Sequence, residues 1–211
     1  MVRSLWTAAT GMNGQQANID TISNNLSNVN TTGYKKQRVE FEDLLYQTIK
    51  TAGTPATEDT VTPLGVQMGS GVKVAATQRM FAQGNLQNTE VSTDLAIVGE
   101  GFFRVQQYDG SYAYTRDGSF KVDSNGQLVN SNGLRVMPEI ILPENFDIST
   151  LSISDDGRVS VKVAGDDNPI QVGQMELYRF ANPAGLEAKG DNLFITSNAS
   201  GDAIASRPGF D

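Results

Sequence analysis

A three–four spacing of apolar side chains runs through the first part of the chain and predicts one long helix over residues 4–29. The members of this repeat, which we call the seam, are Leu5, Ala8, Met12, Ile19, Ile22, Leu26 and Val29, with Gln15 as the one polar position between them. Alternating steps of three and four residues are the heptad spacing of helices that pack side by side. At about 1.5 Å per residue the helix would be about 38 Å long, and Ser4 is its expected N-cap.

The other faces of this helix lack the features that stabilise a helix alone in water. No charged residue lies between Arg3 and Asp20, and Gly11 and Gly14 each cost about 1 kcal/mol relative to alanine. Such a helix is marginal by itself and needs packing partners. It can pack on its own domain or on helices of other chains. The unbroken seam and its uncharged flanks favour other chains, and small residues such as Ala8 would permit close approach.

The segment after the helix combines a turn, a short apolar element and a long polar stretch. Gly33 is the expected left-handed residue at the helix end. A second, shorter element of helical type is predicted from Phe41, Leu44, Leu45, Tyr46 and Ile49. Residues 51–71 are rich in Thr, Gly and Pro and predict an extended loop or a long irregular hairpin. A loop of this length is unusual inside a compact domain, so we expect it to touch a partner or to be disordered.

From about residue 85 the apolar positions alternate with polar ones, which is the period of a β-strand. Asp-Gly and Asn-Gly pairs separate the alternating runs and are strong hairpin signals. These pairs lie at residues 109–110, 117–118, 125–126, 132–133 and 156–157. Closely spaced turns predict short antiparallel strands in a compact sandwich or barrel. The predicted fold class is mainly β with a long N-terminal α-helix, that is, an antiparallel β-sandwich or barrel-like domain plus a helical assembly segment.

These patterns, together with the family resemblance described below, divide the chain into four parts. We expect an assembly helix in residues 1–34, a connecting segment with the extended loop in 35–84, an antiparallel β-domain in 85–190, and a return segment in 191–211.

Composition argues against catalysis. The chain has neither cysteine nor histidine, which removes thiol nucleophiles, disulfides, most catalytic zinc sites and the usual proton-transfer side chain. Sixteen Lys and Arg against 24 Asp and Glu give a net charge of −8, and no basic patch suits nucleic acid. No apolar run is long enough to span a bilayer, and the N-terminus lacks the pattern of a secretory signal peptide. We therefore expect no enzyme, no cofactor, no metal and no membrane insertion.

Three short motifs resemble chemical sites without their companions. Ser70 and Lys73 have the spacing of a serine acyl-enzyme but lack its other elements. Gly99 and Gly101 begin like a dinucleotide-binding loop, yet the third glycine is missing and a turn is expected. The run from Asp123 lacks the glutamate that closes a calcium loop, so a hairpin turn, or at most a weak surface calcium site, is expected.

Several separate segments resemble the flagellar rod and hook family. The run NNLSNVNTTGYK at residues 24–35 is similar to the family signature, and other matching segments lie at 83–86, 94–97, 101–103 and 114–120. FEDLLYQTI at residues 41–49 resembles the distal-rod members in particular. The resemblance covers essentially the whole chain.

This resemblance implies a structural role. In the family the N-terminal helix pairs with a C-terminal helix, and many subunits stack these pairs into a hollow, rigid tube that transmits torque from motor to hook. The β-domain lies outside, and residues 46–70 look like the insertion that stiffens the distal rod. The implied subunit interface comprises Leu5, Ala8, Met12, Ile19, Ile22, Leu26, Val29, Leu44, Leu45 and Tyr46.

The same resemblance implies the partners and the location. Further copies of the chain, proximal rod and hook subunits, and the L- and P-ring proteins around the rod are the expected partners. The expected location is the periplasm-spanning basal body, reached by flagellar type III export without a cleaved signal peptide. Family members continue into a C-terminal helix beyond residues 207–211, so we expect this 211-residue form to lack the partner of its seam.

Two alternatives remain open. The chain can be a hook or proximal-rod subunit of the same family. It can instead be a glycan-binding β-module with a helical anchor, in which Tyr108, Tyr112 and Tyr114 line the binding surface; aromatic strand residues also serve as cross-strand packing. An enzyme that uses carboxylates alone is a distant third.

Overall fold

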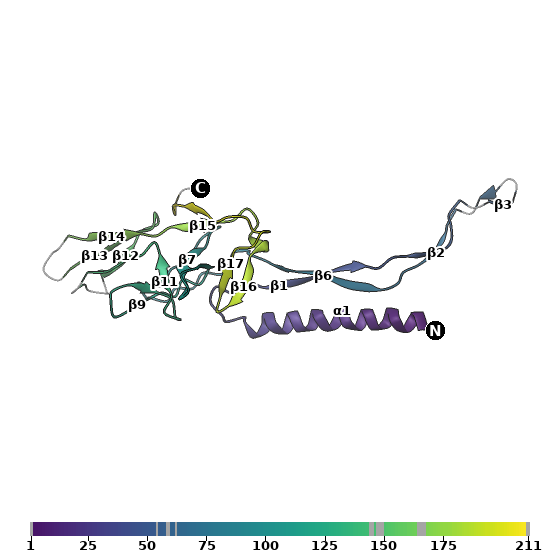
Figure 1. Ribbon diagram of the computed structural model, residues 1–211, viewed down its shortest axis with the longest axis horizontal. Coiled ribbons are helices and arrows are strands. Elements are labelled where there is room, and N and C mark those ends of the chain that lie inside the picture. Colours follow the sequence, from purple (N-terminus) through teal and green to yellow (C-terminus); the bar gives the residue numbers. More distant parts are fainter. Residues whose placement is uncertain are drawn as a thin grey trace. The chain divides into compact units, whose positions relative to one another are not determined.

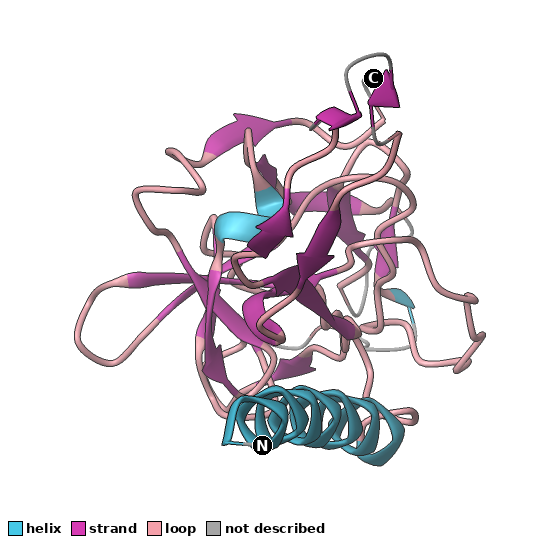
Figure 2. Cartoon of the chain, turned by 90° about the vertical axis from the view of Figure 1, so that its right-hand side faces the viewer, coloured by secondary structure: helices cyan, strands magenta, loops and turns pink. Residues whose placement is uncertain are grey.

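A computed structural model describes residues 2–53, 55–57, 60–61, 63–143, 146, 150–163 and 168–209. The described chain has one long helix and consists otherwise mainly of short strands and loops (Figures 1 and 2). The predicted fold class, mainly β with a long N-terminal helix, is confirmed. Two compact units are present: unit 1 contains residues 1–29 and 36–80, and unit 2 contains residues 30–35 and 81–211.

Unit 1 is a helix packed on a β-ribbon. The helix is α1 (Val2–Ser27), and β1 (Gln37–Asp43) pairs antiparallel with β6 (Val72–Arg79). Nested within this pair, β2 (Gln47–Lys50) pairs with β5 (Val66–Met68), and β3 (Pro55–Thr57) pairs with β4 (Thr60–Val61). Where it is described, the stretch at 51–71 is therefore the irregular hairpin, one of the two predicted alternatives.

The helical element predicted around residues 41–49 is wrong. Phe41 belongs to β1, and Ile49 belongs to β2. The spacing of the apolar residues fits a helix, but the backbone of β1 pairs with β6, whose partner residues lie 29–42 positions further along the chain. Cross-strand ion pairing reinforces this ladder, since Lys73 Nζ lies 2.9 Å from the Glu42 carboxylate.

Both predicted boundary residues of the helix are displaced. The helix begins at Val2, so Ser4 lies inside its first turn and the N-cap prediction is wrong. The first turn is fixed by Arg3, whose guanidinium donates hydrogen bonds to the side chain of Gln47 and to the carbonyl of Met68. Gly33 is left-handed, with φ of 72°, but it belongs to a separate turn six residues beyond Ser27.

Unit 2 is built from antiparallel sheets. The largest is a curled sheet in the strand order β16-β17-β8-β7-β11-β10-β9, beside a three-stranded sheet β12-β13-β14 and a pair β15-β18. The bounds are β7 (Phe103–Gln106), β8 (Tyr112–Thr115), β9 (Lys121–Val122), β10 (Leu128–Val129), β11 (Arg135–Met137), β12 (Ser152–Ile153), β13 (Arg158–Val161), β14 (Ile170–Gln174), β15 (Leu177–Arg179), the 3₁₀ helix η2 (Pro183–Gly185), β16 (Glu187–Gly190), β17 (Leu193–Ile195) and β18 (Ile204–Ser206).

The core of unit 2 has two clusters. Alternating strand residues such as Val105, Val159 and Val161 are fully buried in the larger cluster. The smaller cluster is aromatic and includes Phe102, Phe180 and Phe194, whose rings meet edge to face. Period-two burial on these strands accounts for the alternation seen in the sequence.

Four of the five predicted hairpin turns join paired strands. The Gly of the pairs at 109–110, 125–126, 132–133 and 156–157 has positive φ, and each pair connects neighbouring antiparallel strands. The pair at 117–118 differs, because β8 and β9 are not paired. There a Cβ on Gly118 would lie 1.8 Å from the Leu95 carbonyl oxygen, so glycine is needed for close backbone approach.

The short segment 30–35 packs on unit 2. A Cβ on Gly33 would lie 2.7 Å from the backbone nitrogen of Asp117. The Asn192 side chain donates to the Thr32 carbonyl at 3.0 Å, and Lys35 Nζ donates to the Ala82 carbonyl at 2.8 Å. The family-like signature at residues 24–35 thus ends in a turn that is bound to the β-domain.

Candidate functional site

The seam of α1 lies at the surface of the described chain. Its six large apolar side chains, those of Leu5, Met12, Ile19, Ile22, Leu26 and Val29, are 56–69% exposed. Ala8 is exposed as well. Full burial of one such side chain stabilises a protein by about 1.5–3 kcal/mol. Burial of the parts of these six side chains that are now exposed would therefore contribute about 6–12 kcal/mol. Among its described residues, unit 1 therefore presents a long apolar stripe that is mostly exposed.

A different face of the helix binds the ribbon, and we call it the inner face. Its residues, all partly or fully buried, are Thr7, Thr10, Gly14, Ala17, Thr21, Asn25 and Asn28. Gly14 is the one buried residue among those described in α1, and a Cβ there would lie 3.3 Å from the Phe41 ring and 3.5 Å from Val72. Small side chains therefore let the helix approach the ribbon closely, within one chain rather than between chains.

Asn25 fastens the helix to the ribbon by hydrogen bonds. Its side-chain Nδ2 donates to the Gln37 carbonyl at 2.8 Å, and the Gln37 backbone N–H donates to Asn25 Oδ1 at 2.9 Å. The amide thus satisfies both backbone groups at the start of β1, as a neighbouring strand would. The sequence left open whether the helix packs on its own domain or on other chains, and in the structure these two alternatives concern different faces of the helix. The inner face is used within the chain, and the seam stays open.

The ends of the helix carry no charges that complement its dipole. No acidic residue lies in the first turn and no basic residue in the last. Such charges normally stabilise a solvent-exposed helix by a few tenths of a kcal/mol or more at each end. Their absence agrees with a helix whose stability comes from packing.

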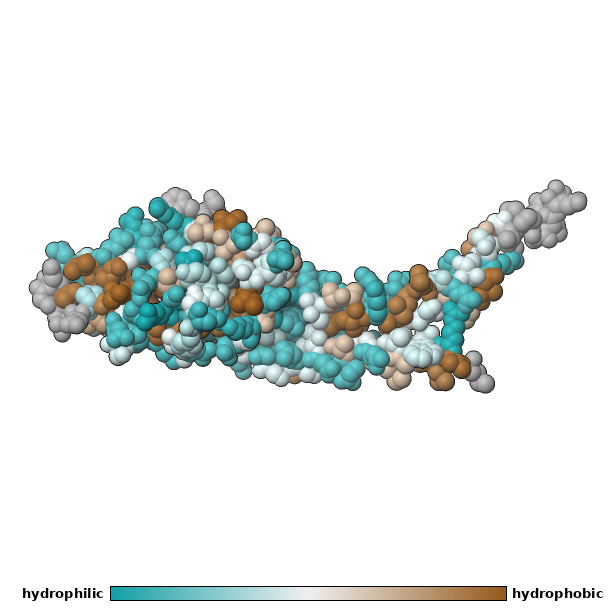
Figure 3. All heavy atoms as spheres, viewed as in Figure 1, coloured by the Kyte–Doolittle hydropathy of each residue, from teal (hydrophilic) through white to brown (hydrophobic). Residues whose placement is uncertain are grey.

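The three other predicted interface residues lie where β1 leads into β2. Leu44 is partly buried, Leu45 is 90% exposed, and Tyr46 is 56% exposed with its ring beside Gly69. The structure also exposes apolar residues that the sequence reasoning did not assign to an interface. These are Val2 and Trp6 on α1, and Ile49, Leu64, Val66 and Met68 on the hairpin. Figure 3 shows apolar side chains exposed on both the helix and the hairpin of unit 1.

A period-two pattern was present in the hairpin and would have pointed to these residues. Leu64, Val66 and Met68 are two residues apart, which places them on one side of an extended strand. The surrounding Thr, Gly and Pro residues obscured that alternation.

The chemical motifs of the sequence have structural roles. Lys73 is paired with Glu42, and the Ser70 hydroxyl lies 3.5 Å from Arg3, so the two residues do not form a nucleophile and base. Gly101 forms a turn with φ of 137° that leads into Phe102 and β7. Among the described residues, no group of three or more carboxylates could hold a metal ion. Within the described part of the chain, no helix is long and apolar enough to cross a membrane.

Shifted pKa values likewise have structural causes. Hydrogen bonds from the backbone N–H groups of Gln127 and Asn125 lower the pKa of Asp123, and hydrogen bonds from Ser111 lower that of Asp109. Burial raises the pKa of Tyr114, and burial followed by the positive charge of Arg116 lowers the pKa of Lys35. The aspartate shifts belong to turns in which the side chain binds its own backbone.

The three tyrosines considered for a glycan surface do not share one site. Tyr114 is buried in the aromatic cluster, with its ring centroid 4.9 Å from that of Phe180. The guanidinium of Arg104 lies over the ring of Tyr112, 4.6 Å from its centroid. The prediction of a surface made by all three is therefore wrong, because Tyr114 faces inward. Tyr108 is 84% exposed and lines a pocket to which neither of the other two tyrosines contributes.

Comparison with known proteins covers both units. Residues 5–35, which include the seam, match the family model described as flagella basal body rod protein. Residues 96–161 match the model of the flagellar hook protein FlgE/F/G D1 domain.

Individual relatives extend this match along the chain. The flagellar basal-body rod protein FlgG of Borreliella burgdorferi is 58% identical over 99% of this chain and 79% of its own length. The protein of the same name from Bacillus subtilis is 39% identical with the same coverage. The flagellar hook protein FlgE of Helicobacter pylori is 46% identical, but over 64% of this chain and 19% of its own length. With near-complete coverage by rod proteins and partial coverage by a hook protein, the chain belongs to the flagellar basal-body rod protein family, on the FlgG branch.

Proposed function

We propose that the chain is a structural subunit of the flagellar distal rod, which self-assembles through the seam into a rigid hollow shaft that transmits torque from motor to hook. Family membership supports self-assembly with other axial components of the flagellum. One observation of the fold carries the proposal: the apolar seam is exposed, while the small and polar inner face binds the chain's own ribbon. A helix that only completed its own domain would bury the apolar face instead.

The seam and residues 44–46 make separate contacts in this proposal. Helices of neighbouring subunits pack against the seam, that is, against Leu5, Ala8, Met12, Ile19, Ile22, Leu26 and Val29. Leu44, Leu45 and Tyr46, at the base of the hairpin, contact an adjacent subunit outside the helix layer. Contacts at both levels would resist bending, because two separated interfaces must both slide when the shaft bends.

The wider assembly follows from the same assignment. Proximal rod subunits would meet one end of the polymer and hook subunits the other, with the L- and P-ring proteins around the periplasm-spanning part. We assign no catalytic role, in agreement with the structural names of the relatives and with a chain that contains no histidine or cysteine.

The test places a charge in the seam. Ile22→Asp in the gene of a flagellated host would bury an unpaired carboxylate at the subunit contact, which costs several kcal/mol per subunit. We expect loss of swimming and no rods in isolated basal bodies. Asn13→Asp is the matched control, since Asn13 is exposed on the helix outside both the seam and the inner face.

The control variant should swim and build rods as the parent does. Circular dichroism of both purified variants should show the parental unfolding transition of unit 2. Normal rods from Ile22→Asp would refute the proposal, and so would equal loss of rods from both variants.

A further inference from the structure

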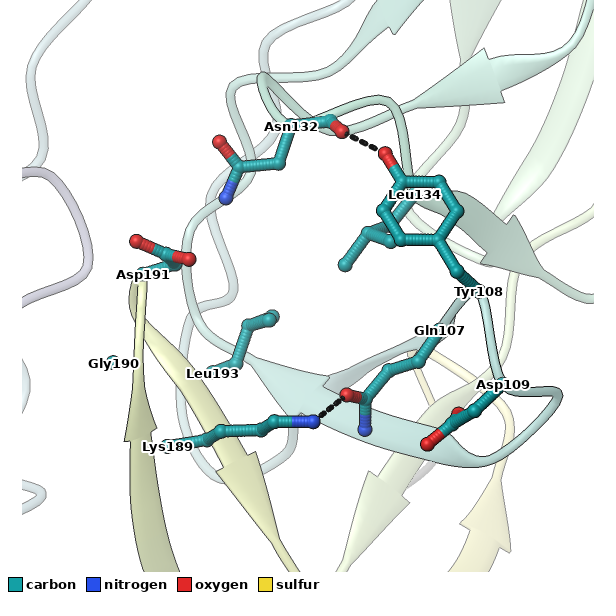
Figure 4. A pocket seen from close by; sticks show the side chains of 9 residues that line it. All are labelled: Gln107, Tyr108, Asp109, Asn132, Leu134, Lys189, Gly190, Asp191 and Leu193. Carbon is teal, nitrogen blue, oxygen red and sulfur yellow. Dashed lines mark hydrogen bonds between the residues drawn. The ribbon is translucent and has the colours of Figure 1, made fainter.

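Three hairpin turns of unit 2 converge around a pocket of about 360 Å³ (Figure 4). They are the β7–β8 turn, the β10–β11 turn and the β16–β17 turn. The pocket lies within unit 2 alone, and none of its lining residues belongs to the seam or to the hairpin of unit 1. Its lining residues are Gln107, Tyr108, Asp109, Asn132, Leu134, Lys189, Gly190, Asp191 and Leu193.

The aromatic part of the pocket is fixed although it is exposed. The Tyr108 side chain is 84% exposed, yet its hydroxyl donates a 2.6 Å hydrogen bond to the Asn132 carbonyl. That bond joins the first turn to the second and holds the ring in place. Leu134 and Leu193, which are themselves buried, provide an apolar lining. A ring held in position before binding costs a ligand less conformational entropy than a free one.

The polar part of the pocket is also organised. Lys189 donates a hydrogen bond to the side-chain oxygen of Gln107, which links the third turn to the first (Figure 4). Figure 4 shows the Asp191 carboxylate and the Asn132 side-chain amide on one side of the opening and the Tyr108 ring on the other, and neither polar group has a hydrogen bond to described residues. Asp191 has φ of 54° and Asn192 of 59°, as a two-residue turn between twisted strands requires.

The charges disfavour an ionic ligand. Two carboxylates, those of Asp109 and Asp191, repel an anion such as phosphate, and the one ammonium group, that of Lys189, is already bound by Gln107. A metal cation would lack ligands there, because no group of three or more carboxylates converges among the described residues. What remains is a set of amide and carboxylate groups that can exchange hydrogen bonds with hydroxyl groups, next to an aromatic ring and an apolar lining. A neutral molecule with many hydroxyl groups and one apolar face satisfies both parts.

We propose that this pocket binds a neutral carbohydrate, with a pyranose ring placed on the face of Tyr108 and its hydroxyl groups bound by Asn132, Asp191 and Gln107. The volume lies near the lower end of the range for ligand sites, which suits one or two sugar rings rather than a long chain. Tyrosine supplies a rigid amphipathic surface that packs against the C–H face of a sugar while its hydroxyl stays hydrogen-bonded.

The experiment is an NMR titration of the ¹⁵N-labelled full chain with the neutral sugars N,N′-diacetylchitobiose and cellobiose, and with inorganic phosphate as the ionic probe. We expect amide shifts confined to the three turns at sugar concentrations up to about 10 mM, since a small ligand with few contacts binds weakly. Phosphate should cause no shifts there. Tyr108→Ala should weaken sugar binding by about tenfold or more.

Tyr112→Ala is the matched control, because Tyr112 is an exposed tyrosine that packs on Arg104 outside the pocket. Its sugar affinity should equal that of the parent. Asp191→Asn keeps a hydrogen-bonding group and should retain binding within a few fold. The proposal is overturned if neither sugar shifts the turns, if phosphate does so instead, or if Tyr108→Ala binds as well as the parent.

Discussion

Asn25 offers the sharpest test of which face of α1 turns inward. Replacing it by alanine removes both hydrogen bonds between the helix and Gln37, at 2.8 and 2.9 Å. Each such bond contributes about 1 kcal/mol net, so about 2 kcal/mol is lost. The Gln37 N–H and carbonyl also lose their partner in a partly buried position, which adds up to about 1 kcal/mol. The better helix propensity of alanine returns about 0.6 kcal/mol.

The balance is a loss of about 2 kcal/mol in the free energy that holds the helix on the ribbon. Because 1.4 kcal/mol is a factor of ten, amide hydrogen exchange in α1 and β1 should accelerate by about thirtyfold. Asn13→Ala is the control, since Asn13 is exposed and its replacement changes only helix propensity. Equal exchange rates in the two variants would refute the assigned inner face, and faster exchange in Asn13→Ala would refute it more strongly.

Two further predictions concern unit 2. Gly33→Ala should lower the unfolding free energy of unit 2 by about 2 kcal/mol or more in urea, because φ is 72° and the new Cβ would lie 2.7 Å from the Asp117 backbone nitrogen. The control is Gly110→Ala, where φ is similar and the space is open, and it should cost about 1 kcal/mol. Equal losses in the two variants would contradict the close approach at Gly33. Asp123 should titrate below the ordinary aspartate pKa of about 3.9, because hydrogen bonds from Gln127 and Asn125 favour its ionised form. The stability it contributes is then present above the unfolded-state pKa and lost as pH falls through the lowered one. Carboxyl NMR checks this, and a normal or raised pKa would be inconsistent with the turn.

Much of unit 2 was predictable because its signals are local. An Asp-Gly or Asn-Gly pair needs only its own backbone to form a turn, and period-two alternation reports which side of a strand meets the core. The strand ladder of unit 1 is not local, since β1 pairs with residues 29–42 positions away. Phe41, Leu44 and Ile49 matched a helical spacing, and nothing near them in sequence revealed the partner strand.

The candidate site was predictable in part. The apolar repeat marked a helix face, and the structure places that face at the surface. The sequence did not predict that the inner face packs on the ribbon, because this face consists of small and polar residues, such as Gly14 and Asn25, rather than apolar ones. The pocket of unit 2 could not be predicted from the sequence, for another reason. Its residues come from three turns, and the bonds that join them link residues 24 and 82 positions apart, a separation at which one sequence does not show that the turns meet.

The central claim is that the seam is open in the free subunit and covered in the polymer, and the absence of cysteine permits a direct measurement. In Met12→Cys the sole thiol lies in the seam, where the parental side chain is 67% exposed. Its rate of alkylation by a maleimide is measured in the soluble chain, in isolated rods, and again after the rods are dissociated. We predict rapid alkylation of the soluble chain, at least about tenfold protection in rods, and recovery on dissociation. Equal rates in rods and in the soluble chain would contradict the account.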